Sequence, residues 1–197
     1  MVPRGDEGDQ MDQPLINGQL AGKPAKLDAI DLRIINELQK SSKITNAALA
    51  EHIGISPPST LDRVRKLESC GVIAGYVALL NPDAINKSIQ AIVHVSLSSH
   101  TSASLAKAKE ALSQFDEVLA CWHTAGDEDF VLKVIVCDMA QYERFISEKL
   151  STVPNVRKIR TAFVLSAVKE TTRIPIAMDE SDNGQMTGKP RTRRTRA

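Results

Sequence analysis

The spacing of apolar residues predicts that the folded part of the chain begins with an amphipathic helix and a helical hairpin. Between Leu27 and about Lys40 the apolar positions follow the 3.6-residue period of a helix, and they are Leu27, Ile30, Ile34, Ile35 and Leu38. Asp28 and Asp31 favour the N-terminus of this helix. A shorter helix is expected from Thr45, a good cap, to Gly54, which can adopt the positive φ of a tight reversal.

A third helix is expected directly after the reversal, and its two sides differ in polarity. Ser56 suits the capping position, Pro57 the first helical position and Gly71 the position after the last turn. The apolar side would carry Leu61, Val64 and Leu67. The opposite side would carry Ser59, Asp62, Arg63 and Lys66, with Arg65 on its flank and Thr60 toward the apolar side. This layout is typical of a helix-turn-helix, whose second helix enters the DNA major groove, although a plain helical hairpin has the same pattern.

The rest of the chain alternates between strand and helix patterns. An apolar run at 72–80 predicts a strand that leaves the helices. The predicted order is then strand, helix, strand, strand, helix, strand, at residues 90–97, 102–115, 118–125, 130–137, 138–150 and 156–168. This order is typical of a ferredoxin-like sandwich, in which both helices cover one face of an antiparallel sheet. Burial of the other face needs a further partner, and a second copy of the chain is the simplest candidate.

Composition and charge narrow the classes of function. Aromatic residues make up only 4% of the 197 residues, which argues against a surface that stacks on single-stranded nucleic acid. The formal net charge of +1 hides an uneven distribution, because five basic residues gather near the end: Lys189, Arg191, Arg193, Arg194 and Arg196. We expect this tail to be disordered, and either to solubilise the chain or to attract DNA phosphates in a salt-sensitive way.

The cysteines and the apolar segments indicate a cytoplasmic protein. The three cysteines form no CxxC pair, so neither a disulfide framework nor a zinc site is expected. No segment suits a signal peptide, and no apolar run approaches the about 20 residues of a membrane helix. The sequence has no nucleotide fingerprint, P-loop or Ser-His-Asp spacing. We therefore expect no cofactor, no metal and no membrane partner.

A helix-turn-helix followed by a ferredoxin-like domain resembles the Lrp/AsnC family of feast/famine regulators. The residues that carry the resemblance are 27–39, 49–56, 63–68, 71–73 and the hairpin at 124–130, and the match spans about 27–174. The resemblance implies an α+β protein, with an N-terminal winged helix-turn-helix and a C-terminal ferredoxin-like βαββαβ domain. It also implies a transcriptional regulator, not an enzyme, that binds double-stranded DNA and a small effector, commonly an amino acid. Homodimers or larger rings such as octamers are implied as well.

The implied domain organisation has five parts. They are a disordered tail at 1–25, a helix-turn-helix DNA-binding domain at 26–75, a connector strand at 76–89, a ferredoxin-like effector-binding and oligomerisation domain at 90–174, and a disordered basic tail at 175–197. In the DNA-binding domain the resemblance implies groove-facing roles for Ser59, Arg63 and Lys66. Ser56 and Arg65 would contact phosphates. Arg63 is the first choice for a base contact, because a guanidinium can grip guanine at two atoms.

The resemblance also implies an effector site near the hairpin. Gly126 would let backbone donors approach a ligand carboxylate, and Asp127 or Asp129 could pair with an α-ammonium group. Thr124 could add a hydroxyl. The other interpretation is that Gly and Asp simply suit a tight turn.

Two further functions stay open at this point. Siroheme decarboxylases look like this family in overall architecture but use histidines and arginines near a tetrapyrrole, and this chain has four histidines: His52, His94, His100 and His123. The polar and partly basic third helix favours DNA over that enzyme. The second alternative is an amino-acid sensor that acts through another regulator and does not itself bind DNA.

Overall fold

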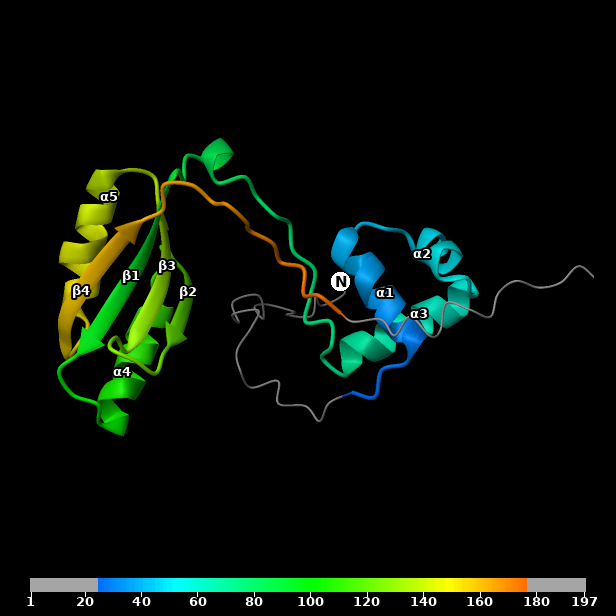
Figure 1. The fold of residues 1–197 in the computed structure, drawn as a ribbon, viewed down its shortest axis with the longest axis horizontal. Helices are drawn as coiled ribbons and strands as arrows, with labels where there is room; N and C mark the ends of the chain where they lie inside the picture. Colours follow the sequence, from blue (N-terminus) through cyan, green and yellow to red (C-terminus); the bar gives the residue numbers. More distant parts are fainter. Residues whose placement is uncertain (1–24, 177–197) are drawn as a thin grey trace, which may run out of the picture. The chain divides into compact units, whose positions relative to one another are not determined.

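The computed structural model describes residues 25–176, and the chain divides into two units that we treat separately (Figure 1). The helical unit comprises residues 25–77 together with residues 171–176, and the sheet unit comprises residues 78–170. The tails predicted at 1–25 and 175–197 lie outside the described residues, apart from residues 25, 175 and 176. No helix of the described part is long and apolar enough to span a bilayer.

The helical unit contains α1 (Ala29–Lys40), α2 (Asn46–Ile53) and α3 (Pro57–Ser69). Thr45 and Ser56 cap α2 and α3 as predicted, since their side chains accept hydrogen bonds from the backbone N–H groups of Ala48 and Ser59. Gly54 has φ 80° and therefore makes the predicted left-handed reversal between these helices. The apolar centre of the unit is formed by Ile34, Leu49, Ile53 and Leu67.

The end of α3 is fixed by a glycine at the predicted position. Gly71 has φ 72°, and its N–H donates to the carbonyl oxygen of Glu68 at 3.0 Å. The N–H of Val72 donates to the carbonyl of Leu67 at 2.9 Å. These two bonds are those of a Schellman motif, which satisfies the last carbonyls of a helix.

The prediction that Leu61 belongs to the buried side of α3 is wrong. Its side chain is 38% exposed, whereas Thr60 and Leu67 are fully buried. A spacing of three residues drifts about 60° per step around a helix of 3.6 residues per turn, so only the i, i+4, i+7 series stays on one side. That series is Thr60, Val64 and Leu67, and the Thr60 hydroxyl is satisfied by donating to the carbonyl of Ser56 at 3.1 Å.

The sheet unit has the predicted βαββαβ order. Its elements are β1 (Ile89–Leu97), α4 (Ser102–Ser113), β2 (Val118–His123), β3 (Phe130–Val136), α5 (Met139–Arg144) and β4 (Val156–Phe163). The chain continues from α5 through a π-helical turn, Phe145–Lys149, and a 3-10 turn, Leu150–Thr152. The sheet is antiparallel with strand order β2-β3-β1-β4. This confirms the ferredoxin-like fold class.

Alternation along the strands decides which side chains enter the core. Alternate residues of β1 and β3, from Ala91 to Leu97 and from Phe130 to Val136, pack with buried residues of both helices and the π-helical turn: Ala108, Leu112, Tyr142 and Phe145. Both helices therefore cover the same face of the sheet. The opposite face carries half-buried apolar residues such as Ile92, Val131 and Ile135, and it has no helical cover within the sheet unit.

Two predicted strands differ from the structure. The connector expected as a strand within 76–89 contains no strand before Ile89, and only a 3-10 turn, Asp83–Ile85, interrupts its irregular backbone. The last strand ends at Phe163 instead of 168, where its pairing with Ala91 of β1 stops, and beyond that pair only the N–H of Val164 donates to β1, to the carbonyl of Gln90 at 2.9 Å. In both cases the apolar pattern is that of a strand, but a strand needs a neighbour to form its hydrogen bonds.

Candidate nucleic-acid interface and effector hairpin

The polar side of α3 forms one continuous surface. Ser59, Asp62, Arg63 and Lys66 line a single open depression together with Asp28, which precedes α1. The structure thus brings together the three residues predicted to face the groove. Lys66 and Ser59 are exposed, while the Arg63 side chain is 29% exposed.

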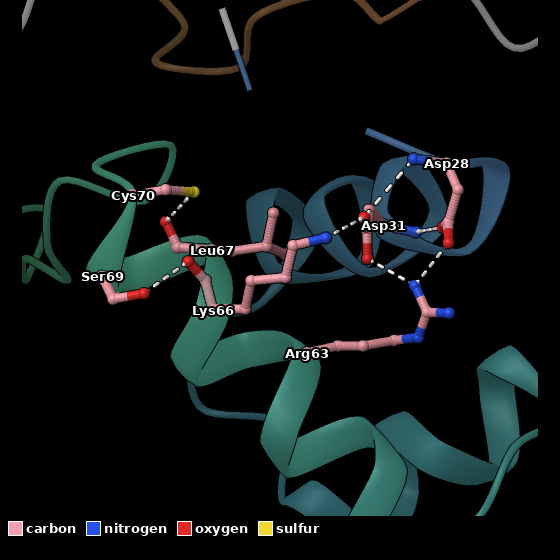
Figure 2. Close-up of polar contacts among 7 residues, drawn as sticks. All are labelled: Asp28, Asp31, Arg63, Lys66, Leu67, Ser69 and Cys70. Atoms are coloured by element: carbon pink, nitrogen blue, oxygen red, sulfur yellow. Dashed lines mark hydrogen bonds and ion pairs between the residues drawn. The ribbon is translucent and has the colours of Figure 1, made fainter. Parts of the chain in front are cut away.

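Arg63 is held by two carboxylates from the start of α1 (Figure 2). Its Nη1 donates to Oδ2 of Asp28 at 2.7 Å and to Oδ1 of Asp31 at 2.6 Å. These hydrogen bonds raise the pKa of Arg63 above its ordinary value, so the guanidinium stays charged. The contact joins α3 to α1 across more than 30 residues of sequence.

Asp31 is the buried member of this cluster, with no exposed surface. A buried carboxylate is stable only with charged or hydrogen-bonded partners. Arg63 occupies Oδ1 of Asp31, and the other oxygen, Oδ2, accepts from the backbone N–H of Asp28 at 3.3 Å and from Nζ of Lys66 at 3.4 Å. Asp28 returns a capping bond, because its Oδ1 accepts from the N–H of Asp31 at 2.8 Å. Both cations on the depression therefore share one buried acid.

Asp28 is more exposed but is also stabilised in its charged form. Its partial burial alone would raise its pKa, but the N–H of Asp31 and the guanidinium of Arg63 outweigh that effect and lower the pKa below its ordinary value. The sequence predicts for Asp28 and Asp31 only a favourable interaction with the start of a helix. Their spacing identifies a cap, but the pairing with Arg63 depends on how α1 and α3 pack.

The residues expected at DNA phosphates differ in their surroundings. Arg65 is exposed and makes no side-chain hydrogen bond or ion pair within residues 25–176. Ser56 is occupied by capping, and its Oγ lies 2.8 Å from Oγ of Ser59. Each hydroxyl still has one lone pair or hydrogen available, because a hydroxyl can donate once and accept twice.

The hairpin between β2 and β3 uses two of its four candidate residues for its own structure. The Thr124 hydroxyl donates to the carbonyl of Glu128 at 2.8 Å. Oδ2 of Asp129 accepts from the N–H of Leu97 at 2.7 Å, and its Oδ1 lies 2.8 Å from Nε2 of His100. Thr124 and Asp129 therefore fix the hairpin to itself and to the end of β1.

The other two candidates, Gly126 and Asp127, have no such structural role in the hairpin. Gly126 and Asp127 are exposed, and Asp127 forms no side-chain hydrogen bond with any described residue. Gly126 does not have a positive φ, and a Cβ built on it would meet nothing within 4 Å. Neither the φ of residue 126 nor the space around it therefore requires glycine in this turn.

The four histidines occupy separate environments. His52 pairs with Glu37 in the helical unit, with Nδ1 3.2 Å from Oε2, whereas His100 pairs with Asp129 in the sheet unit. His123 packs against the ring of Phe130, and His94 lies on β1. Within the described residues no three His, Cys, Asp or Glu side chains are grouped so that they could hold a metal ion.

Comparison with known families finds two matches that together span the described part. Residues 27–74 match the family described as winged helix-turn-helix DNA-binding, and residues 90–174 match the Lrp/AsnC ligand binding domain. Among full-length relatives, the leucine-responsive regulatory protein of Haemophilus influenzae is 39% identical over 145 residues. That alignment covers 74% of this chain and 87% of the relative.

Solved structures with the same fold include two bacterial regulators. A transcriptional regulator of Neisseria meningitidis, solved as a complex with L-Met, superimposes with a TM-score of 0.72 at 31% identity, covering 76% of this chain and 96% of that one. An AsnC family transcriptional regulator of Agrobacterium tumefaciens also gives a TM-score of 0.72, at 33% identity, covering 76% and 97% of the two chains.

Proposed function

The chain belongs to the Lrp/AsnC family of DNA-binding transcriptional regulators, and from that premise we propose that α3 reads duplex DNA while the sheet unit binds an amino acid. The observation that carries the proposal is the depression on α3, where Ser59, Arg63 and Lys66 lie together. Arg63 contacts a base, and Ser59 and Lys66 add groove contacts. Ser56 and Arg65 contact phosphates and set the position of the helix.

The effector contacts are assigned to the exposed part of the hairpin. The complex of the Neisseria meningitidis regulator with L-Met supports an amino acid as effector. Gly126 lets the ligand approach the backbone closely, and Asp127 pairs with the α-ammonium group. Thr124 and Asp129 hold the hairpin in shape through the bonds described above.

The functional form is a homodimer or a larger ring, joined through the uncovered face of the sheet. The apolar side chains of that face support this assembly. Trp122 is 51% exposed, and Ile92, Val131 and Ile135 are only half-buried. A second copy would cover these side chains. The assembled protein acts in the cytoplasm, in keeping with the three cysteines, which form no disulfide within the described residues.

Neither alternative function fits the relatives. They are transcriptional regulators, not enzymes, which sets aside the tetrapyrrole-enzyme interpretation. The match to a DNA-binding helix-turn-helix over residues 27–74 likewise sets aside a sensor that never binds DNA.

Selection of preferred duplexes from a random library, followed by binding titrations, tests the DNA-reading role of α3. Arg63→Ala should weaken binding to the selected duplex by about 1–3 kcal/mol and relax preference at one base position. Arg65→Ala is the matched control, because loss of a phosphate contact weakens all sequences alike. If Arg63→Ala keeps the affinity and base preference of the wild-type protein, Arg63 is not part of the site. If the wild-type protein does not bind duplex DNA at low salt, the proposed function is wrong.

A further inference from the structure

Asp28 and Asp31, at the start of α1, determine which N–H groups of Arg63 are occupied as well as stabilising its charge. A guanidinium is planar and has five N–H donors: two on Nη1, two on Nη2 and one on Nε. Both donors of Nη1 are taken, by Asp28 at 2.7 Å and Asp31 at 2.6 Å. Nε and Nη2 form no hydrogen bond with any described residue. The edge between Nε and Nη2 is therefore the part of Arg63 that remains available to a ligand (Figure 2).

We propose that Asp31 is a positioning residue for base reading, which fixes the plane of the Arg63 guanidinium so that its Nε–Nη2 edge meets a guanine. The inference rests on the proposed DNA-reading role of α3. Guanine offers N7 and O6 as two adjacent acceptors in the major groove, and one edge of a guanidinium matches them. Asp31 suits this task because its own position is fixed, since it lies fully buried in the first turn of α1 and accepts from a backbone N–H.

The same carboxylates oppose binding to DNA of any sequence. Asp28 and Asp31 are negative charges beside Arg63 and Lys66, so they reduce the attraction of these cations for phosphates. A free arginine on this surface would bind phosphate in many orientations. An arginine held by two acids loses part of that attraction but needs less ordering when it binds a base. Asp31 therefore favours the correct sequence over other sequences, without favouring DNA binding in general.

Asp31→Asn separates these two effects, because asparagine keeps the size and one acceptor oxygen but not the charge. The measurement is the ratio between the Kd for random duplex and the Kd for the duplex selected by the wild-type protein. We expect this ratio to fall about 3–10-fold, a part of the 5–150-fold worth of a good bidentate base contact. Affinity for random duplex should stay equal or rise, because one negative charge is lost. The relaxed base position should be the one that Arg63→Ala relaxes.

Glu51→Gln is the matched control for net charge. Glu51 is an exposed acid of α2, lies outside the depression and forms no side-chain ion pair within residues 25–176. Its neutralisation should raise affinity for all duplexes alike and leave the ratio unchanged. A second variant, Asp28→Asn, keeps a good helix cap and changes a side chain that is 53% exposed, so it tests the same edge without disturbing a buried group. It should lower the ratio less than Asp31→Asn does. If Asp31→Asn fails to fold, the inference is tested by Asp28→Asn alone, which should still lower the ratio.

Coupling to Arg63 completes the test. In an Arg63→Ala background, Asp31→Asn should not change the ratio further, because Asp31 acts through Arg63. A variant Asp31→Asn that folds and keeps the wild-type ratio would overturn the inference while leaving the DNA-reading role intact. Uniform weakening at every base position would also overturn it, because that result indicates a purely structural carboxylate. Absence of any sequence preference in the wild-type protein would instead refute the proposed function.

Discussion

At the scale of single residues, exposed side chains that the fold does not use are the best candidates for ligand contacts. Asp127 contrasts with Asp129 two positions later, whose two oxygens are occupied by Leu97 and His100. A carboxylate without an internal partner contributes little to stability, so its loss affects mainly what it binds.

Asp127→Ala should therefore abolish the effector response and leave the fold and DNA binding largely intact. Calorimetric titration with a panel of amino acids measures ligand binding, and duplex titration with and without the best ligand measures the response. Asp116→Ala, which removes another exposed acid from the sheet unit, is the control and should bind normally. An unchanged response in Asp127→Ala would move the effector site away from the hairpin.

At the scale of elements, the boundaries of the helices depend on a few backbone conformations and ion pairs. Gly54 joins α2 to α3 with a positive φ, a conformation that costs an L-residue about 1–2 kcal/mol. Lys149 in the π-helical turn binds Glu117 just before β2, with Nζ 2.7 and 3.0 Å from the two carboxylate oxygens. The conformation of Gly54 sets the boundary between α2 and α3, and the Glu117–Lys149 pair ties the π-helical turn to the start of β2.

Gly54→Ala should destabilise the reversal by about 1 kcal/mol, since alanine strains at this φ although space for its Cβ exists. Hydrogen exchange over residues 46–69 is the appropriate measurement, because it reports on α2 and α3 alone. Gly126→Ala makes the same chemical change where φ is not positive, and there we expect no loss of protection. Equal protection in wild type and Gly54→Ala would contradict this account.

The Glu117–Lys149 pair should make the sheet unit less stable in acid. Burial alone would raise the pKa of Glu117, but the bonds from Lys149 lower it below the ordinary value. The stabilisation is therefore complete above the pKa of the unfolded chain, about 4.3, and is lost as pH falls through the lower folded value. Glu117→Gln should cost about 1 kcal/mol at pH 7, and this difference should shrink as pH falls below about 4. Urea unfolding between these pH values, with the exposed Glu148→Gln as control, checks both expectations.

At the scale of the whole molecule, apolar surface remains that neither unit buries. Ile92 alternates with the core residues Ala91 and Val93, so it lies on the face of the sheet away from α4 and α5. The connector exposes Leu79 and Leu80. Apolar surface of this kind is typical of an interface between copies.

Ile92→Glu should convert the assembly into monomers, because a carboxylate on a covered apolar face has no partner to offset its desolvation. Sedimentation velocity measures the change, and circular dichroism checks that the sheet unit stays folded. Ala103→Glu places the same charge on the exposed side of α4 and should leave the assembly unchanged. Full assembly of Ile92→Glu would exclude this face as the interface.

The elements and their order could be predicted from the sequence because they depend on local physical rules. Periods of 3.6 and 2 residues, caps such as Thr45 and Ser56, and the glycines at 54 and 71 act within a few positions of themselves. The βαββαβ order then indicated the fold class. A spacing of three was misleading for Leu61, because the rotation of the helix separates residues that a linear pattern groups.

Only the tertiary structure decided which polar groups meet. Asp31 and Arg63 are 32 positions apart, and Gln39 exchanges two hydrogen bonds, of 3.1 and 2.6 Å, with the backbone of Ile174, 135 positions away. Such contacts depend on the packing of whole elements, so no local pattern predicts them. The connector did not form its predicted strand because, within the described residues, no strand is hydrogen-bonded to it.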